Sequence, residues 1–437
     1  MKKQNALSLL PIGIFVFLYL GLGILFEYIM KIPMGFYEVP IVVVFLVALF
    51  VAIVQNRAIS FERKLALMGE GVGDKNIITM LLIFMLAGIF VGVVGRSSAE
   101  SVAYFFLSVV PPRFAVLVLF LVSCFISTAM GTSVGTITLL VPIAVSVATA
   151  SGFPLALCVG TVMGGAMFGD NLSFISDTTI AACGGQGCAM KDKFRTNFAV
   201  VVPAALVTIL IILFFSFGTE INDISSVEYD LLKIIPYILV LIGGIVGINV
   251  FLVLGIGILT GSVIMLADGT TLPSLLSGMG KGAAGMFETA MVAVLVAALC
   301  ALIRAGGGFD ALLSAIKRVF RGKRGGQLGM GLLVGAMDIA TANNTVAIVM
   351  ANPIAKEMAE EYGIAPRKTA SILDTFSCIF QGILPYGAQM LVALSAVSAM
   401  GASLSAFEVI PFLFYPFLLL ASSLVFIFLV PERKTDK

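Results

Sequence analysis

Long apolar stretches, separated by short polar ones, run through almost the whole chain. A membrane-spanning helix needs about 20 mostly apolar residues, and ten stretches approach or exceed that length. This pattern excludes a soluble globular fold and predicts an all-α polytopic membrane protein. The expected spans lie at about 6–29, 39–55, 77–95, 155–183, 196–217, 234–249, 250–267, 286–304, 369–399 and 406–430.

Two further apolar stretches have a polar interruption near the middle. They cover about 114–150 and 325–355, and each is too long for one helix and too short for two full spans. The interruptions read GTSVGT at 131–136 and ANNTVA at 342–347. Non-helical backbone at membrane depth is tolerated only where protein or water covers it. We therefore predict two re-entrant helical hairpins, each entering and leaving the membrane on the same side.

The two halves of the chain resemble each other at an offset of 211 residues. VPIA at 141–144 matches NPIA at 352–355 at this offset, and the two hairpins coincide. With one residue of slippage, GDNLSF at 169–174 faces QGILPY at 381–386. A constant offset that preserves polar breaks as well as glycines indicates an internal duplication.

We predict a first repeat at 1–220 and a second at 221–437. Each repeat contains one hairpin and five spanning helices, one of which is a broken helix at about 155–183 or 369–399. Because five is an odd number of crossings, the second repeat is expected to be inverted relative to the first. Inverted repeats with broken helices at the membrane midplane are typical of secondary transporters.

The charged residues between the spans predict the orientation of the chain. Lysine and arginine are enriched in cytoplasmic loops, and ten spans place every basic cluster on one side. We therefore expect both termini to be cytoplasmic and one acidic loop to be external. The basic clusters are Arg57, Arg63, Lys64 and Lys75; Lys191, Lys193 and Arg195; Lys317, Arg318, Arg321, Lys323 and Arg324; Lys356, Arg367 and Lys368; and Arg433, Lys434 and Lys437. The acidic loop contains Glu220, Asp223, Glu228 and Asp230.

The composition excludes several classes of function. Hydrophobic residues make up 60% of the chain and charged residues 11%, against about a quarter charged in soluble domains. A net charge of +2 without a basic stripe argues against a nucleic-acid partner. The chain has no histidine, and its six cysteines follow neither a zinc nor a disulfide pattern, so we expect no cofactor. GKRGG at 322–326 is not a phosphate loop, and no nucleophile with a base or metal set suggests an enzyme.

Four polar breaks interrupt the apolar sequence, at 131–136, 169–178, 343–345 and 381–389. Glycine and proline open the helical backbone there and expose carbonyl oxygens that a helix would otherwise use. Serine, threonine, asparagine and aspartate add the oxygen ligands that can replace water around a small cation. We therefore predict a cation site where these breaks meet.

Acidic residues in or near the breaks are the strongest candidates for ion coupling. An ionisable group at membrane depth is costly and suggests a functional site, although an aspartate can also cap a helix N-terminus. Asp170 and Asp177 lie in the second break, Asp338 precedes the third, and Asp374 precedes the fourth. The predicted ion or substrate ligands are Asp170, Asp177, Thr132, Ser133, Thr136, Asn171, Ser173, Asn343, Asn344, Thr345, Asp338, Asp374 and Gln381, with sodium held by Asp170, Thr132, Ser133 and Asn171.

The first hairpin and the following break carry a family resemblance. GTSVGTITLLVPIA at 131–144 and GTVMGGAMFGDNLSFISDTT at 160–179 resemble the NhaC-type sodium/proton antiporter family of bacteria. Phe174 stands where many relatives carry proline. The resemblance implies the fold of the ion transporter superfamily, with paired re-entrant hairpins, and assembly as a homodimer. The matching residues are Thr132, Ser133, Gly135, Thr136, Pro142, Gly169, Asp170, Ser173, Ser176, Asp177, Thr178 and Thr179.

These observations predict a sodium/proton antiporter of the bacterial inner membrane, which exchanges cytoplasmic sodium for protons by alternating access. Its expected partners are the lipid bilayer, sodium ions and protons. The alternative is a sodium-coupled transporter of a small organic solute, such as an amino acid or a carboxylate. Asn343, Asn344, Gln381 and Gln389 favour this alternative, because amide-rich breaks can hold a carboxylate as well as an ion.

Overall fold

The structure is a computed structural model, and it confirms that the chain is all-helical. It is 86% helix, and no strand occurs in the part of the chain that it describes. Both chain ends lie outside that part, as do Glu220, Asp223 and Glu228 of the acidic loop and Arg433, Lys434 and Lys437 at the C-terminus. The described residues are 5–32, 38–55, 57, 59–174, 176–219, 222, 229–246 and 248–429.

Helices follow one another along both halves of the chain. The first half contains α1 (Leu10–Ile24), α2 (Ile41–Gln55), α3 (Phe61–Val72), α4 (Lys75–Val109), α5 (Ala115–Met130), α6 (Ser133–Ser151), α7 (Leu155–Leu172), α8 (Asp177–Gln186) and α9 (Met190–Gly218). The second half contains α10 (Leu231–Val246), α11 (Val250–Ala267), α12 (Leu272–Gly285), α13 (Phe287–Ala305), α14 (Gly308–Val319), α15 (Gly322–Thr341), α16 (Asn344–Tyr362), α17 (Pro366–Ile383), α18 (Ala388–Ala399), α19 (Ala406–Val409) and α20 (Phe414–Phe428).

The described helices support a multi-pass membrane protein. Nine segments are long and apolar enough to cross a membrane, and the bent pair of α19 and α20 would be a tenth. In the first hairpin, α5 and α6 each pass this test, which differs from the expectation of two short arms. In the second hairpin, neither α15 nor α16 passes it: α15 contains Lys323, Arg324 and Asp338, and α16 contains Lys356 and Glu357.

Two segments that we predicted as cytoplasmic loops are helical instead. The segment after Arg57 forms α3, whose N-terminus is capped by Ser60 Oγ accepting from the backbone N–H of Arg63 at 3.3 Å. Lys191, Lys193 and Arg195 lie in the first turns of α9. Hydropathy alone misplaced these turns, because charged residues can continue a helix when their charges are compensated by the protein.

The helix bounds repeat along the chain at the predicted offset. Helices α6 and α7 recur as α16 and α17, with both ends of each shifted by 211 residues. Helices α3 and α8 begin 211 residues before α12 and α18. Left-handed backbone ends α5 at Gly131 and α15 at Ala342, which also match at this offset. The helix ends follow the offset without the slippage of the sequence alignment, so Asp170 corresponds to Gln381.

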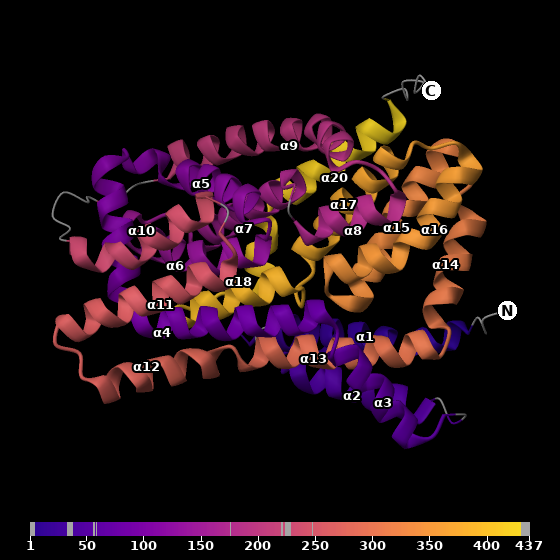
Figure 1. Ribbon diagram of the computed structural model, residues 1–437, viewed down its shortest axis with the longest axis horizontal. Helices are drawn as coiled ribbons and strands as arrows, with labels where there is room; N and C mark the ends of the chain where they lie inside the picture. Colours follow the sequence, from indigo (N-terminus) through magenta and orange to yellow (C-terminus); the bar gives the residue numbers. More distant parts are fainter. Residues whose placement is uncertain are drawn as a thin grey trace.

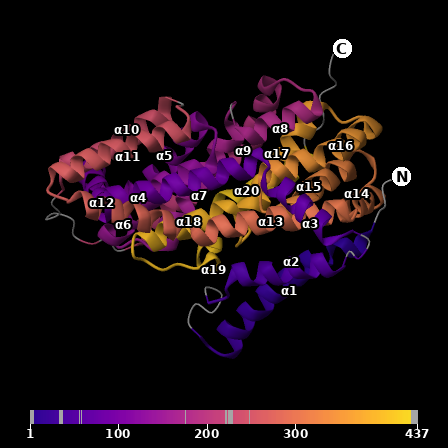
Figure 2. The ribbon, with the colours of Figure 1, turned by 60° about the horizontal axis from the view of Figure 1, so that its bottom comes forward.

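The two halves exchange their short helices. Helix α8 packs on α16 and α17 of the second half, and α18 packs on α6 and α4 of the first half (Figure 1). Two apolar cores result, one around α5–α7 and one around α15–α17. Helices α1 and α2 lie side by side at the edge of the molecule, where α2 contacts α13 and both helices add side chains to the second core (Figure 2). The exchange brings all four helix breaks to the boundary between the cores.

Candidate functional site

The four helix breaks surround a cavity of about 70 Å³. This is several times the roughly 10–15 Å³ that one water requires, so an ion with part of its hydration shell fits. Eight predicted ligands line the cavity: Asp170, Asp177, Thr132, Ser133, Asn343, Asn344, Thr345 and Gln381. Further lining residues are Thr79, Met80, Ile83, Gly131, Val134, Ser176, Thr178, Ala388 and Gln389.

Asp170 is the buried carboxylate of this cavity. It lies in the last turn of α7 and is 5% exposed. Ser133 Oγ donates to its Oδ2 at 2.8 Å, and Ser176 Oγ donates to its Oδ1 at 2.5 Å. Within the described residues it forms no ion pair. The Asp170 carboxyl group thus accepts from two hydroxyl groups and faces the cavity, and among the described residues no cationic side chain contacts it.

Amide oxygens lie on the wall that the second half contributes. Gln389 Nε2 donates to Ser133 Oγ at 2.8 Å, and Gln381 Nε2 donates to the backbone oxygen of Ala342 at 2.9 Å. Each glutamine directs its N–H to protein, and each Oε1 is buried without a hydrogen-bond partner in the described chain. A buried unpaired carbonyl is costly. These two oxygens are therefore available to a ligand with positive charge or a hydrogen-bond donor.

The hairpin tips use their polar side chains mainly to end and begin helices. Thr132 Oγ1 accepts from the N–H of Gly135 at 3.3 Å, and Asn343 Oδ1 accepts from that of Val346 at 2.9 Å. Ala342 has φ 48°, a left-handed conformation that costs a non-glycine residue about 1–3 kcal/mol. The hydrogen bond from Gln381 to this carbonyl helps to hold the strained turn at the cavity wall.

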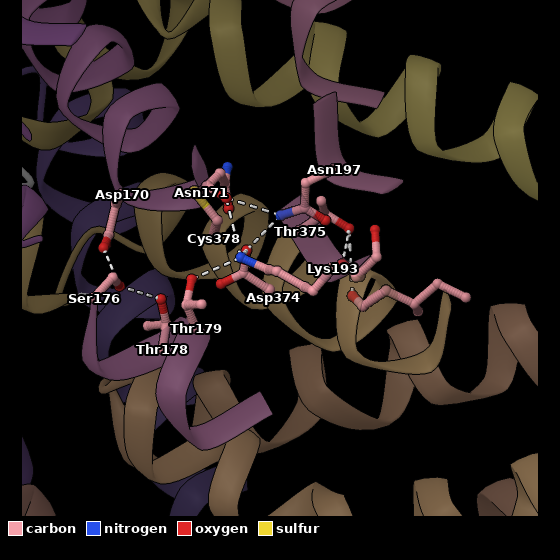
Figure 3. A network of polar contacts seen from close by, with 12 residues as sticks. Asp170, Asn171, Ser176, Thr178, Thr179, Lys193, Asn197, Asp374, Thr375 and Cys378 are labelled. Atoms are coloured by element: carbon pink, nitrogen blue, oxygen red, sulfur yellow. Dashed lines mark hydrogen bonds and ion pairs between the residues drawn. The ribbon is translucent and has the colours of Figure 1, made fainter. Parts of the chain in front are cut away.

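Asp374 lies outside the cavity and has a counter-ion. Lys193 Nζ is 2.7 Å from Asp374 Oδ2, and both side chains are 1% exposed (Figure 3). Asn197 Nδ2 also donates to this carboxylate oxygen, at 2.8 Å. The negative charge of Asp374 is therefore neutralised inside the protein.

Thr136, Asn171 and Ser173 do not line the cavity, and Asp177 lines it only at an exposed edge. Asn171 Nδ2 donates to Tyr415 Oη at 3.2 Å, and Thr136 Oγ1 donates to the backbone oxygen of Thr132 at 2.9 Å. Ser173 is buried after the end of α7. Asp177 is exposed at the first residue of α8, where the helix dipole favours a negative charge.

Asp338 is fully buried in the last turn of α15 and does not line the cavity. Neither carboxyl oxygen has a hydrogen-bond partner among the described residues. The neighbouring Ser377 directs its hydroxyl to the backbone oxygen of Asn344 at 3.3 Å. An ionised Asp338 would therefore be unfavourable, because a buried charge without a partner is costly.

Four polar residues that the structure places in or beside the site are absent from the predicted ion ligands, although Ser176 is named above as a motif residue and Gln389 as support for the organic-solute alternative. Ser176 and Gln389 line the cavity, and Lys193 and Asn197 hold Asp374. Ser176 lies inside the family motif, and Gln389 inside the fourth break. Lys193 and Asn197 are four residues apart, so they share one face of a helix, a signal that treating Lys193 as a loop residue concealed.

Comparison with known proteins gives the family. The sequence model of the Na+/H+ antiporter family matches residues 8–217 and 219–431. The Na(+)/H(+) antiporter NhaC of Bacillus subtilis is 24% identical over 381 residues, which cover 78% of this chain and 82% of that protein. The Malate-2H(+)/Na(+)-lactate antiporter of the same organism is 25% identical over 197 residues, 44% of this chain and 42% of that protein.

A crystal structure of the YdaH transporter of Alcanivorax borkumensis covers 79% of this chain and 84% of that one, with a TM-score of 0.42 and 14% identity. The matched family consists of membrane transporters rather than enzymes, and its transported coupling ions are sodium and protons. The chain belongs to the Na+/H+ antiporter family and is of its NhaC type.

Proposed function

We propose that the chain exchanges cytoplasmic sodium for protons, and that Asp170 holds the two ions in turn. The observation that carries this proposal is the state of the Asp170 carboxylate, which is buried, faces a cavity and forms no ion pair among the described residues. Its partners are hydroxyl groups, whose lone pairs can turn to an arriving cation. Gln381 Oε1 and Gln389 Oε1 supply neutral oxygens from the opposite wall.

One carboxylate that binds either ion couples their movements. A metal ligand must be deprotonated, so proton release precedes cation binding. The apparent sodium affinity should therefore fall as the pH falls through the range in which Asp170 binds a proton. Thr132, Ser133, Asn344 and Thr345 lie close enough to complete the site as the ion loses its water.

The proposed mechanism is alternating access by two inverted repeats, at 1–220 and 221–437, with re-entrant hairpins and broken helices at the midplane. Support comes from the helix bounds, which repeat at 211 residues, and from the exchange of α8 and α18 between the cores. The two ranges matched by the family model also meet near the proposed boundary. If each repeat crosses the membrane an odd number of times, the second repeat starts on the opposite side from the first, so duplication alone inverts it.

Helix α13 offers a route to the site. A cavity of about 260 Å³ lies beside its Arg304 end, and one of about 200 Å³ lies beside its Glu288 end. A small cavity of about 10 Å³ shares lining residues with both of them, and through Met80 and Asn343 it also adjoins the Asp170 cavity. Access that alternates between the two outer cavities fits exchange across the membrane. The inner membrane, cytoplasmic termini and a homodimeric assembly complete the proposal.

The test is sodium-triggered proton movement in proteoliposomes that contain a pH-sensitive dye. Asp170→Asn keeps the shape of the side chain and removes the charge, so the signal should fall by roughly 100-fold or more. Asp310→Asn, in the first turn of α14 and away from the cavity, is the matched control and should transport normally. An unchanged signal in Asp170→Asn contradicts the proposal.

The second candidate is sodium-coupled transport of a small organic acid. The Malate-2H(+)/Na(+)-lactate antiporter is similar to part of this chain, and the N-termini of α6, α8, α16 and α18 meet at the cavity. Helix N-termini favour anions. A thermal-shift screen of carboxylates and amino acids, with and without sodium, separates the candidates. Stabilisation by one solute only in sodium favours the carrier.

A further inference from the structure

Lys193 Nζ sits in a shell of oxygen atoms. It donates to Asp374 Oδ2 at 2.7 Å, to Thr179 Oγ1 at 2.7 Å and to the backbone oxygen of Asn171 at 3.0 Å (Figure 3). These are one carboxylate, one hydroxyl and one carbonyl oxygen, all from residues that are nearly or fully buried. Carboxylate and carbonyl oxygens are also the ligands that hard metal cations take.

The shell is built by both halves of the molecule. Asn171, Thr179 and Lys193 come from α7, α8 and α9, and Asp374 comes from α17. Asn197 Nδ2 donates to Asn171 O at 2.9 Å and to Asp374 Oδ2 at 2.8 Å, which fixes the separation of these two oxygens. Asn197 Oδ1 is itself buried without a hydrogen-bond partner in the described chain.

The shell adjoins the proposed exchange site. Asn171 follows Asp170 directly, so the end of α7 serves both places: the Asp170 side chain faces the cavity, and the Asn171 carbonyl faces the ammonium group. Ser176, just before α8, donates to Asp170 and contacts Thr178 in the first turn of α8, whereas the next residue, Thr179, contacts Lys193. Two carboxylates thus lie on either side of one helix break, each with oxygen neighbours.

We propose that the shell around Lys193 is a second monovalent-cation site, which the ammonium group of Lys193 occupies as a tethered cation. Removal of that ammonium group leaves Asp374, Thr179 and Asn171 able to bind an external sodium ion. The proposal rests on the proposed function only in assuming that sodium reaches this depth of the protein.

A purely structural ion pair makes a different prediction. Loss of Lys193 would then leave Asp374 without a partner and destabilise the protein whichever salt is present. A cation site instead makes the stability of the variant depend on sodium, because a ligand that binds only the folded state stabilises it. The salt dependence of unfolding therefore distinguishes the two.

The experiment measures thermal unfolding of the purified full-length protein in sodium chloride and in choline chloride of equal ionic strength. Asp170→Asn is the background, because it removes the proposed exchange site. Adding Lys193→Ala should give a melting temperature at least about 2 °C higher in sodium than in choline. Adding Asp374→Asn as a third change should abolish that difference.

Two results overturn the inference. One is an equal sodium response in Asp170→Asn with and without Lys193→Ala, and the other is a response that survives Asp374→Asn. If Lys193→Ala does not fold, Lys193→Met keeps the apolar stem and is measured in the same way. Failure of sodium exchange at Asp170 appears in the transport signal of Asp170→Asn alone, so it is distinguishable from failure of this inference.

Discussion

Asp170 and Asp374 are two buried carboxylates with opposite surroundings. They lie on α7 and α17, two helices whose bounds match at the 211-residue offset. They are not equivalent positions, because the residue that corresponds to Asp170 on α17 is Gln381. Asp170 accepts from two hydroxyl groups and faces a cavity, whereas Asp374 contacts the ammonium of Lys193 and the amide of Asn197. In the proposed mechanism, one residue type thus serves an exchangeable cation at Asp170 and the fixed ammonium of Lys193 at Asp374. The neighbours of a carboxylate, more than its burial, determine which role it has.

The largest difference between the two carboxylates should appear in stability. Asp374→Asn leaves the buried Lys193 charge without its counter-ion, which should cost about 3–5 kcal/mol of unfolding free energy. Asp170→Asn removes a charge that has no counter-ion, so stability without sodium should be unchanged or higher. Thermal unfolding in choline chloride measures both.

The paired replacement Lys193→Met with Asp374→Leu is the control for that difference. It removes both charges together, and such exchanges in protein interiors are often neutral or stabilising. Recovery of most of the lost stability would assign the effect to the unpaired charge. Equal losses in the single and paired variants would mean that packing, rather than charge, distinguishes Asp374.

A smaller effect is expected from the hydroxyl groups around Asp170. Ser176→Ala or Ser133→Ala removes one hydrogen bond to the carboxylate and one oxygen near the ion. Hydrogen bonds to charged groups contribute about 1.5–3 kcal/mol, so the sodium concentration for half-maximal exchange should rise by roughly 10-fold to 150-fold. Ser146→Ala, which removes a buried hydroxyl bonded to the backbone of Pro142, is the matched control and should leave that concentration unchanged.

Removing a neutral oxygen from the cavity wall opposite Asp170 should change the sodium affinity still less. Gln389→Leu deletes an unpaired amide oxygen and the donor to Ser133. Neutral hydrogen bonds contribute about 0.5–1.5 kcal/mol, so sodium affinity should fall roughly threefold to tenfold. Transport measured across a series of sodium concentrations tests this. No change in affinity would place the ion on the Asp170 side alone.

The Asp170 half of the comparison could be anticipated from sequence, because its residues cluster. Asp170, Ser173, Ser176 and Asp177 lie within one break, and the hairpin residue Ser133 belongs to a recognisable motif. Local sequence therefore identifies the carboxylate and one wall of the cavity. It also predicts the helical architecture, since apolar length is a direct membrane constraint.

The sequence predicts Asp374 as a ligand but not its ion pair with Lys193, because the two residues are distant in sequence. Lys193 and Asp374 are brought together only when α9 packs against α17. A hydropathy profile assigns Lys193 to a loop, because Lys191 and Arg195 lie beside it. The profile takes no account of the counter-ion that the fold supplies. The same limit hid α3, a helix with charged residues that hydropathy places outside the membrane.

The smallest effect on stability and exchange is expected from replacing Asp338, whose surroundings resemble neither those of Asp170 nor those of Asp374. Within the described chain it has neither the hydroxyl donors and cavity of Asp170 nor the counter-ion of Asp374. Because an uncompensated buried charge is unfavourable, the neutral acid fits this environment, and Asp338→Asn closely preserves its shape. Stability should change by about 1 kcal/mol or less, and exchange rates should stay within roughly threefold. Rates at several pH values test this, because an exchange that loses its pH dependence in Asp338→Asn would move the proton-binding step from Asp170 to α15.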